Sequence, residues 1–275
     1  MKVGIIGTGN MGSILMEALI QSNIVAEANI NVFNRTESKA QALKNKYNDI
    51  EVCPTLESIV TNSQLIFVCV KPADMHTLFL TINKWTAKTD CVISITSPIS
   101  VQQMEAVLPC NAARFIPSIT NKVLSGVSLI TFGDRCSEEW KTIIRQIADA
   151  ISEPIEIDNS ITRVSSDIVS CGPAFFSYLA QVFIDASCKV TTIDQHTATV
   201  LTEKMLIGFG ELLKSGQYTL PTLQEKVCVK GGITGEGIKV LDNELGDVFE
   251  KLFKATHHKF HEEISKIENQ FEKKY

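Results

Sequence analysis

The sequence lacks any hydrophobic run long enough to span a membrane and any excess of basic residues. Apolar residues make up 44% of the 275 positions, yet their longest runs have the length of β-strands, so we expect no membrane-spanning segment. The segment from Gly7 to Gly12 interrupts the apolar stretch at the N-terminus, which argues against a secretory signal peptide and for a cytoplasmic protein. The formal net charge is −5 and no basic face stands out, which predicts that the protein does not bind nucleic acid.

Closely spaced cysteines are also absent. The eight cysteines are scattered, with no C-x-x-C pair and no histidine at ligand spacing. We therefore expect reduced, structural thiols rather than disulfides or metal ligands. His257 and His261 are four residues apart, as metal ligands on a helix often are, but no carboxylate motif completes a site there. No metal is predicted.

What the chain does contain is a glycine-rich turn near its beginning. Val3–Ile6 is a short apolar run typical of a buried strand, Gly7, Gly9 and Gly12 follow with G-x-G-x-x-G spacing, and apolar residues then recur with helical period. In dinucleotide-binding folds the first glycine allows the turn, the second lets the pyrophosphate approach the backbone, and the third lets helix and strand pack closely. The alternative is an accidental glycine-rich turn. A position between strand and helix favours a dinucleotide site made of Gly7, Thr8, Gly9, Asn10, Met11 and Gly12.

The residues after the second predicted strand, 29–33, indicate which cofactor binds. An acidic residue there would bind the ribose hydroxyls of NAD, whereas arginine favours the 2′-phosphate of NADP. Here the position carries Asn34 and Arg35, so we predict NADPH, with NADH as the alternative cofactor. The other interpretation is a solvated turn before a helix at 37–47.

Strands and helices alternate through the first half of the chain, which predicts an α/β fold with a doubly wound, mostly parallel sheet. Lys71 directly follows one apolar run, at the sheet edge where ligands bind in such folds. The alternative interpretation is that Lys71 is a surface lysine before a helix that begins at Pro72. The expected strands are 3–6, 29–33, 65–70, 91–96, 112–116, 127–132 and 154–157, and the expected helices include 56–61 and 137–151.

After residue 158 the pattern becomes helical. We expect helices over 160–189, 193–214, 221–229 and 233–241, with breaks at Gly172-Pro173, Gly216 and Gly231-Gly232. The last segment carries an apolar stripe from Val248 to Phe271 that needs more cover than one subunit offers. The chain is therefore predicted to have a Rossmann-type domain over 1–158 and a helical domain over 159–275 that forms a homodimer or a larger oligomer.

The loop between two of these helices, Lys230–Gly235, is the second candidate site. Two glycines before a helix expose free backbone amides, Thr234 adds a hydroxyl and Lys230 adds positive charge. Such a loop suits a small carboxylate. A plain flexible turn between helices is the alternative.

Several landmarks together resemble those of the pyrroline-5-carboxylate reductases. The resemblance covers nearly the whole chain, and two stretches, 94–98 and 220–232, are similar to the late-competence, ComER-like branch known from Bacillus. The landmarks are, in chain order, Gly7–Gly12, Val70–Pro72, the segment 114–126, Gly172–Phe175, Asp185–Ala186 and Gly231–Thr234.

Membership of this family implies hydride transfer from NADPH to the C=N carbon of L-1-pyrroline-5-carboxylate, a cyclic imino acid, which yields L-proline. It also implies helices that interlock with those of a partner subunit. A protonated imine is already electrophilic, so the enzyme must supply positioning more than a strong acid.

The resemblance also implies roles for individual residues. It places the pyrophosphate at Gly7–Gly12 and the 2′-phosphate at Asn34 and Arg35. It implies that Thr234 and Lys71 act in catalysis. The nicotinamide side is expected at Val70, Lys71, Pro72, Ile95, Thr96 and Ser97, and the substrate at Lys230, Gly231, Gly232 and Thr234.

The chain departs from the family pattern mainly on the substrate side. The Ser/Thr-Pro that usually precedes the Gly-Gly-x-Thr loop is Val229-Lys230 here, which removes a hydroxyl donor, although Lys230 offers charge in its place. Leu56 stands where an asparagine commonly touches the cofactor. Two alternatives follow: a reductase of another cyclic imine or small carboxylate, and a non-catalytic NADP-binding regulatory protein.

Overall fold

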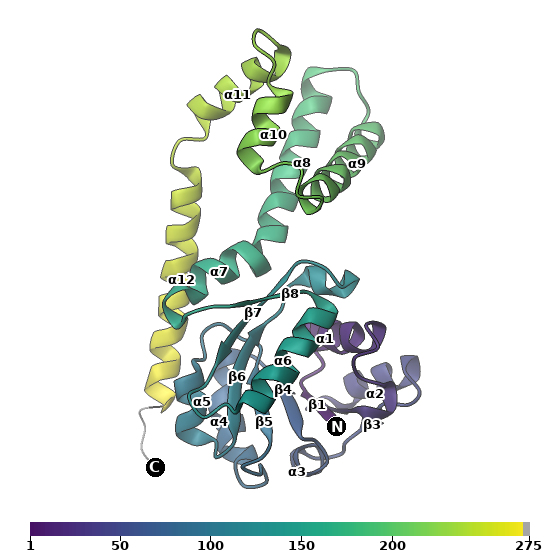
Figure 1. The fold of residues 1–275 in the computed structure, drawn as a ribbon, viewed down its shortest axis with the longest axis vertical. Coiled ribbons are helices and arrows are strands. Elements are labelled where there is room, and N and C mark those ends of the chain that lie inside the picture. The colour runs from purple at the N-terminus through teal and green to yellow at the C-terminus, as the bar shows by residue number, and fades with distance from the viewer. Residues whose placement is uncertain (272–275) are drawn as a thin grey trace. The chain divides into compact units, whose positions relative to one another are not determined.

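The computed structural model describes residues 1–271 and divides the chain into two compact units (Figure 1). The first unit contains residues 1–173 together with the chain from residue 255 onward, and the second contains residues 174–254. The first unit therefore includes both an N-terminal and a C-terminal segment. A boundary between domains at residues 158 and 159 stays a prediction from the change in sequence pattern.

The first unit is built on one sheet of eight strands in the order β3-β2-β1-β4-β5-β6-β7-β8. All neighbours pair in parallel except β6 and β7, which are antiparallel. This confirms the predicted doubly wound, mostly parallel sheet. The strands are β1 (Val3–Ile6), β2 (Ile30–Phe33), β3 (Glu51–Val52), β4 (Leu65–Val68), β5 (Cys91–Ser94), β6 (Asn111–Ile116), β7 (Val127–Phe132) and β8 (Glu153–Glu156).

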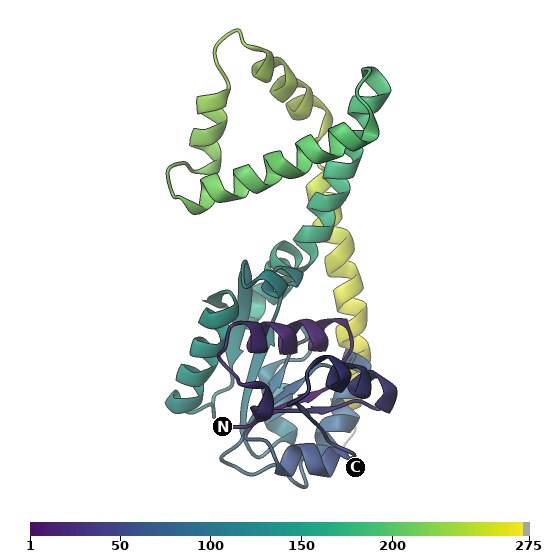
Figure 2. The same cartoon turned by 90° about the vertical axis from the view of Figure 1, so that its right-hand side faces the viewer.

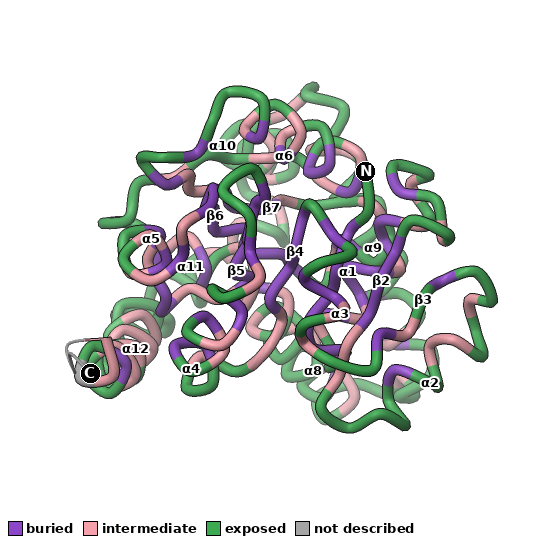
Figure 3. Tube along the Cα trace, turned by 90° about the horizontal axis from the view of Figure 1, so that it is seen from below, coloured by how far each residue is buried: buried purple, intermediate pink, exposed green. Residues whose placement is uncertain are grey.

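Helices cover both faces of this sheet, because its central strands are apolar on both sides. One face packs against α1 (Asn10–Gln21), α2 (Glu37–Lys46) and α6 (Glu138–Ile151). The opposite face packs against α3 (Leu56–Thr61), α4 (Pro72–Ile82) and α5 (Val101–Val107). Figure 3 shows the resulting core, with the strands buried and most of the outer helical surface exposed. Burial of whole strands explains their uninterrupted apolar runs.

The C-terminal part of α12 (Val248–Phe271) belongs to the first unit and packs on the second of these faces. Ile267 is 3% exposed and lies in the same apolar cluster as Phe79 of α4 and Met104 of α5. The ring of Phe271 lies 4.4 Å from the ring of His76. The expectation that the whole stripe needs cover from a partner was therefore wrong for this part of the helix.

The predicted break at Gly172-Pro173 was also wrong. The chain stays helical from α7 (Thr162–Ser166) through a π-helical turn at Asp167–Cys171 into α8 (Gly172–Val190). Proline lacks a backbone N–H and therefore removes one bond from a helical hydrogen-bond ladder. Pro173 directly follows the π-helical turn, where the ladder is already irregular, so the helix continues through it.

The second unit consists of the remainder of α8, then α9 (Gln195–Lys214), α10 (Leu220–Val227), α11 (Ile233–Glu244) and the start of α12. Figure 2 shows these helices as rods that follow one another through short loops. The predicted breaks at Gly216 and Gly231 are confirmed, and both glycines have positive φ, at 68° and 75°.

Large apolar side chains of the second unit are exposed. Phe176, Phe183 and Ile207 are 68%, 64% and 60% exposed. By length and composition alone, the helical stretch Asn159–Val190 could cross a membrane, and 17% of its most apolar window is buried. A helix of a soluble protein that packs against another protein chain can have the same composition. Because few residues of this stretch are buried within its own chain, the stretch forms an exposed apolar surface.

Candidate functional site

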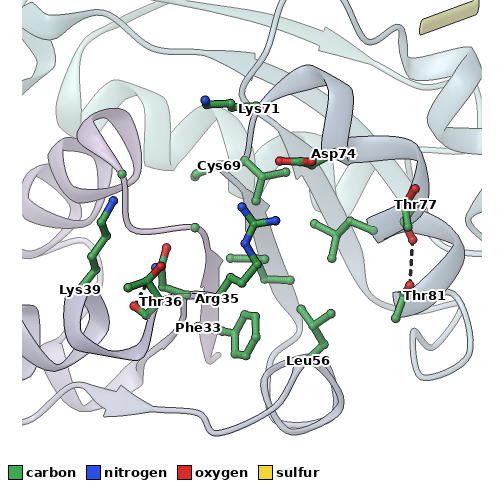
Figure 4. A pocket seen from close by; sticks show the side chains of 16 residues that line it. Phe33, Arg35, Thr36, Lys39, Leu56, Cys69, Lys71, Asp74, Thr77 and Thr81 are labelled. Atoms are coloured by element: carbon green, nitrogen blue, oxygen red, sulfur yellow. Dashed lines mark hydrogen bonds between the residues drawn. The ribbon is translucent and has the colours of Figure 1, made fainter.

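A cavity of about 750 Å³ opens at the carboxyl ends of β1, β2 and β4 (Figure 4). Ligands bind at this edge in open α/β sheets, at the point where the strand order reverses, which here lies between β1 and β4. Six of the predicted cofactor residues line the cavity: Gly7, Gly9, Asn34, Arg35, Val70 and Lys71.

The three glycines of the loop each meet a different steric requirement. Gly7 has a φ of 98°, and a Cβ there would lie 2.7 Å from the carbonyl oxygen of Cys69. A Cβ on Gly12 would lie 2.0 Å from the carbonyl oxygen of Gly7, so helix and turn could not pack. A Cβ on Gly9 would meet no atom within 4 Å. Gly9 thus leaves open the space through which a pyrophosphate would approach the backbone.

The loop also offers groups that an anion would satisfy. Gly9 caps α1 without a side-chain hydrogen bond, so the first amides of this helix are available to an anion. The hydroxyl oxygen of Thr8 is buried and has no hydrogen-bond partner among residues 1–271. A buried polar atom without a partner is costly. The residues present therefore fit a bound phosphate group.

Asn34 holds the glycine loop in place. Its side-chain oxygen accepts a hydrogen bond of 3.0 Å from the backbone N–H of Thr8, and its amide donates to the carbonyl oxygen of Thr36 at 2.9 Å. Both ends of the side chain are therefore already engaged. Asn34 connects the end of β2 to the loop after β1, which positions Arg35 beside the cavity.

The cavity wall carries more charge than the sequence patterns indicate. Arg35 and Lys39 both line it, and Figure 4 shows them with Asp74 of α4 among the side chains around the cavity. Among residues 1–271, neither Arg35 nor Lys39 takes part in an ion pair, so both cations remain available to an anion. Sequence reasoning missed Lys39, Asp74, Thr77 and Thr81. For the three residues of α4 the spacing i, i+3, i+7 places them on one face of the helix and was a usable signal.

Cys69 lies between the end of β4 and the loop, where it serves packing. Its side chain would lie 3.1 Å from a Cβ on Gly12. Burial raises the pKa of the Cys69 thiol well above its ordinary value. The thiol therefore stays protonated and is a poor nucleophile. All eight cysteines are free thiols in the structure.

The segment after β5 lies outside the cavity lining, and two arginines converge on it. Arg114 donates a hydrogen bond of 3.3 Å to the carbonyl oxygen of Ser97, and Arg163 Nη1 lies 3.5 Å from the Ser97 hydroxyl. The hydroxyl of Thr96 lies 3.2 Å from that of Ser94. Of the three residues predicted at the nicotinamide, Ser97 is thus held by β6 and α7. Thr96 is held by Ser94 of β5, and the N–H of Ile95 donates to the carbonyl oxygen of Val68 of β4 at 3.4 Å.

The predicted substrate loop lies in the second unit, between α10 and α11. Gly231 adopts a φ of 75°, and the N–H of Gly232 donates to the carbonyl oxygen of Val229 at 2.8 Å. Gly232 caps α11 without a side-chain hydrogen bond. Thr234 and Lys230 are both exposed. The loop is therefore a tight turn that presents helix amides, a hydroxyl and an ammonium group at its surface.

Two family models match the chain. The model for the pyrroline-5-carboxylate reductase dimerisation domain matches residues 159–263. The model for NADP oxidoreductases, coenzyme F420-dependent, matches residues 2–98. The second match confirms the prediction of an NADP cofactor, and together they identify an oxidoreductase with a helical dimerisation domain.

Similar proteins and structures agree with these matches. Pyrroline-5-carboxylate reductase 3 of Bacillus subtilis (strain 168) is 25% identical over 260 residues, 94% of this chain and 95% of that protein. The NADP-bound structure of Plasmodium falciparum pyrroline carboxylate reductase has a TM-score of 0.81 at 19% identity, covering 96% of this chain and 97% of the other. The Coxiella burnetii pyrroline-5-carboxylate reductase reaches 0.82 at 20% identity, over 98% of each chain, so both share the fold.

ComE operon protein 4 of Bacillus subtilis (strain 168) is 50% identical over 271 residues, covering 98% of this chain and 99% of that protein. Identity at this level over the full length shows common family membership. The glycine loop, the sheet order and the helical domain agree with it. The chain therefore belongs to the pyrroline-5-carboxylate reductase family, on the branch that contains ComE operon protein 4.

Proposed function

We propose that this protein reduces L-1-pyrroline-5-carboxylate to L-proline with NADPH. The observation that carries the proposal is the cavity at the end of β1. It combines a glycine loop that fits phosphate with two cations, Arg35 and Lys39, that form no ion pair within the described residues 1–271. Support comes from the family, because relatives named pyrroline-5-carboxylate reductase match nearly the whole chain at 24–25% identity.

The cofactor-binding half of the proposal assigns each group to one part of the cavity. The amides at the start of α1 and the hydroxyl of Thr8 hold the pyrophosphate, and Arg35 with Lys39 holds the 2′-phosphate. Val70, Lys71 and Pro72, with Ile95, Thr96 and Ser97, form the nicotinamide side. When NADPH is bound, it supplies the hydride, and these residues orient it.

The substrate-binding half of the proposal assigns the loop Lys230–Thr234. The amides of Gly231 and Gly232 and the hydroxyl of Thr234 hold the carboxylate or ring nitrogen of the cyclic imino acid. Lys230 adds positive charge beside this loop, which favours an anionic substrate. Positioning of an electrophilic imine against the reduced nicotinamide requires no additional nucleophile.

The proposal includes a homodimer in the cytoplasm that binds neither nucleic acid nor membrane. The match to a dimerisation domain supports the dimer, as do the exposed apolar side chains of α8 and α9. Exposed apolar surface of this extent is typical of an interface between subunits.

Two observations favour other candidate functions. ComE operon protein 4, at 50% identity, has a name that states an operon and no reaction. Val229-Lys230 also departs from the usual family residues at the substrate loop. A non-catalytic NADP-binding regulatory protein and a reductase of another cyclic imine are therefore the rival proposals.

One experiment separates the three. NADPH oxidation is followed with L-1-pyrroline-5-carboxylate and with a panel of cyclic imines, while NADPH binding is measured separately by its fluorescence. Turnover of the first substrate supports the main proposal, turnover of other imines alone supports the second reductase, and tight binding without turnover supports the regulatory role. Thr234→Val should lower turnover about tenfold while sparing NADPH affinity, and Thr234→Ser should restore turnover.

A further inference from the structure

Arg114 is the largest fully buried side chain among the described residues, with 1% of its surface exposed. It lies on β6, where the register pairs it with Ser94 of β5. Within the part of the chain that the structure describes, its guanidinium donates only to neutral oxygens. The acceptors are the carbonyl oxygens of Ser97 (3.3 Å) and Ile99 (3.4 Å) and the hydroxyls of Thr131 (3.1 Å) and Thr162 (2.5 Å).

The charge of Arg114 is not neutralised by a carboxylate. Within residues 1–271 it takes part in no ion pair, and its Nε atom is buried without a hydrogen-bond partner. Burial lowers the pKa of the Arg114 guanidinium to about 10, so the group remains protonated at neutral pH. A buried cation without an anionic partner is costly, and such groups are usually paired.

The neighbouring arginine differs in this respect. Arg163 also reaches Ser97, but its Nη2 atom donates to the carboxylate of Asp167 at 2.7 Å. The two guanidinium groups and one carboxylate leave a net positive charge beside the segment that ends at Ser97. Under the proposed function, this segment forms the nicotinamide side of the cofactor site, and the following inference rests on that assignment.

The two redox states of the cofactor differ in charge at this place. The oxidised nicotinamide ring carries a positive charge and the reduced ring carries none. In a protein interior, a cation about 10 Å away disfavours a second positive charge by roughly tenfold in binding. We infer that Arg114 makes the site select the reduced cofactor over the oxidised one. This preference favours hydride donation and the release of NADP⁺ after each turnover.

The test compares the dissociation constants of NADPH and NADP⁺ in the full-length protein. NADPH binding is followed by fluorescence, and NADP⁺ binding by calorimetry. The wild type should bind NADPH about tenfold more tightly. Arg114→Met removes the charge and should bring the ratio of the NADP⁺ and NADPH dissociation constants close to one. Arg114→Lys retains the charge and should keep most of the preference for NADPH. An unchanged ratio in Arg114→Met would overturn the inference.

A second pair of variants keeps the arginine and thus tests the inference if Arg114→Met does not fold. Thr131→Asp places a carboxylate against the guanidinium, and Thr131→Asn provides a neutral control of the same shape. The ratio should fall in Thr131→Asp alone, and equal ratios in the two variants would contradict the inference. Failure of the wild type to bind either cofactor would instead refute the proposed function.

Discussion

The hydroxyl of Thr256 donates a 2.8 Å hydrogen bond to the carboxylate of Asp167, 89 residues earlier in the chain. Asp167 is fully buried in the π-helical turn, and Arg163 donates to its other oxygen at 2.7 Å. This carboxylate therefore ties the C-terminal part of α12 to α7. A buried carboxylate that loses one of its donors is left with an unsatisfied lone pair.

Thr256→Val should therefore destabilise the first unit by about 1–3 kcal/mol. The change is measured as the shift in the urea midpoint of unfolding. Thr142→Val is the matched control, because Thr142 is exposed on α6 and its hydroxyl donates only to the Glu138 carbonyl at 2.8 Å. Equal effects of the two substitutions would show that the Asp167 contact does not stabilise the fold.

His76 should make stability depend on pH. It is 7% exposed and lies against Phe271, and burial lowers the pKa of its imidazole below the ordinary value of about 6.5. The unfolded chain then binds more protons near that pH, so stability is fully present above about pH 6.5 and is lost as pH falls toward the folded pKa. His76→Gln should flatten the dependence of the melting temperature on pH over this window, and an unchanged dependence in this variant would contradict the role of His76.

Two glycine substitutions should separate folding from cofactor binding. Gly9→Ala places a methyl group in open space at a φ of −74°, so the melting temperature should stay close to that of the wild type while NADPH binding is lost. Gly12→Ala drives a methyl group to 2.0 Å from a backbone oxygen and should lower the melting temperature itself. Retained NADPH affinity in Gly9→Ala would place the pyrophosphate elsewhere.

Arg35→Ala should weaken NADPH binding by about 1.5–3 kcal/mol, because a charge-assisted hydrogen bond to the 2′-phosphate is lost. NADH lacks this phosphate, so its affinity should change little. Titration of both cofactors measures the difference, and Lys84→Ala, an exposed lysine outside the cavity, controls for the general loss of positive charge. An equal loss for both cofactors would remove Arg35 from the phosphate site.

The exposed face of α8 should form a subunit interface. Light scattering is expected to give at least twice the 30.3 kDa of one chain. Phe183→Asp, which places a charge at a position 64% exposed in the single chain, should shift the mass toward the monomer. Ile24→Asp, a partly exposed apolar residue of the first unit, should not. A wild-type protein that stays monomeric would contradict the assignment.

Local sequence patterns predicted the bounds of a helix or strand correctly where the residues of that element alone determine them. The strands β1 and β7 and the helix α3 have the bounds that hydrophobic patterning predicts. The sequence did not reveal β3, which has two residues, or the extents of α4 and α5. For α5 a signal existed, because Ser100 and Gln103 form a reciprocal capping box.

The candidate site also contains residues that local sequence patterns predicted and residues that they did not. Gly7–Gly12 and Arg35 were recognisable from the sequence, because a strand, a tight turn and a helix are adjacent along the chain. The sequence did not indicate Asp74 of α4 at the cavity or Arg163 beside Ser97. These residues meet only after parallel strands bring distant segments to one edge of the sheet.

The sequence by itself determined the α/β class and the glycine turn after the first strand, because periodicity and glycine spacing are local properties of the chain. It also determined the family, through landmarks that are spread along nearly the whole chain. Only the tertiary structure decided that Arg114 is buried with no carboxylate partner among residues 1–271, that Asp167 holds α12, and that the helix continues through Pro173. Burial and charge pairing depend on which segments pack together, and that information is not contained in any single stretch of the chain.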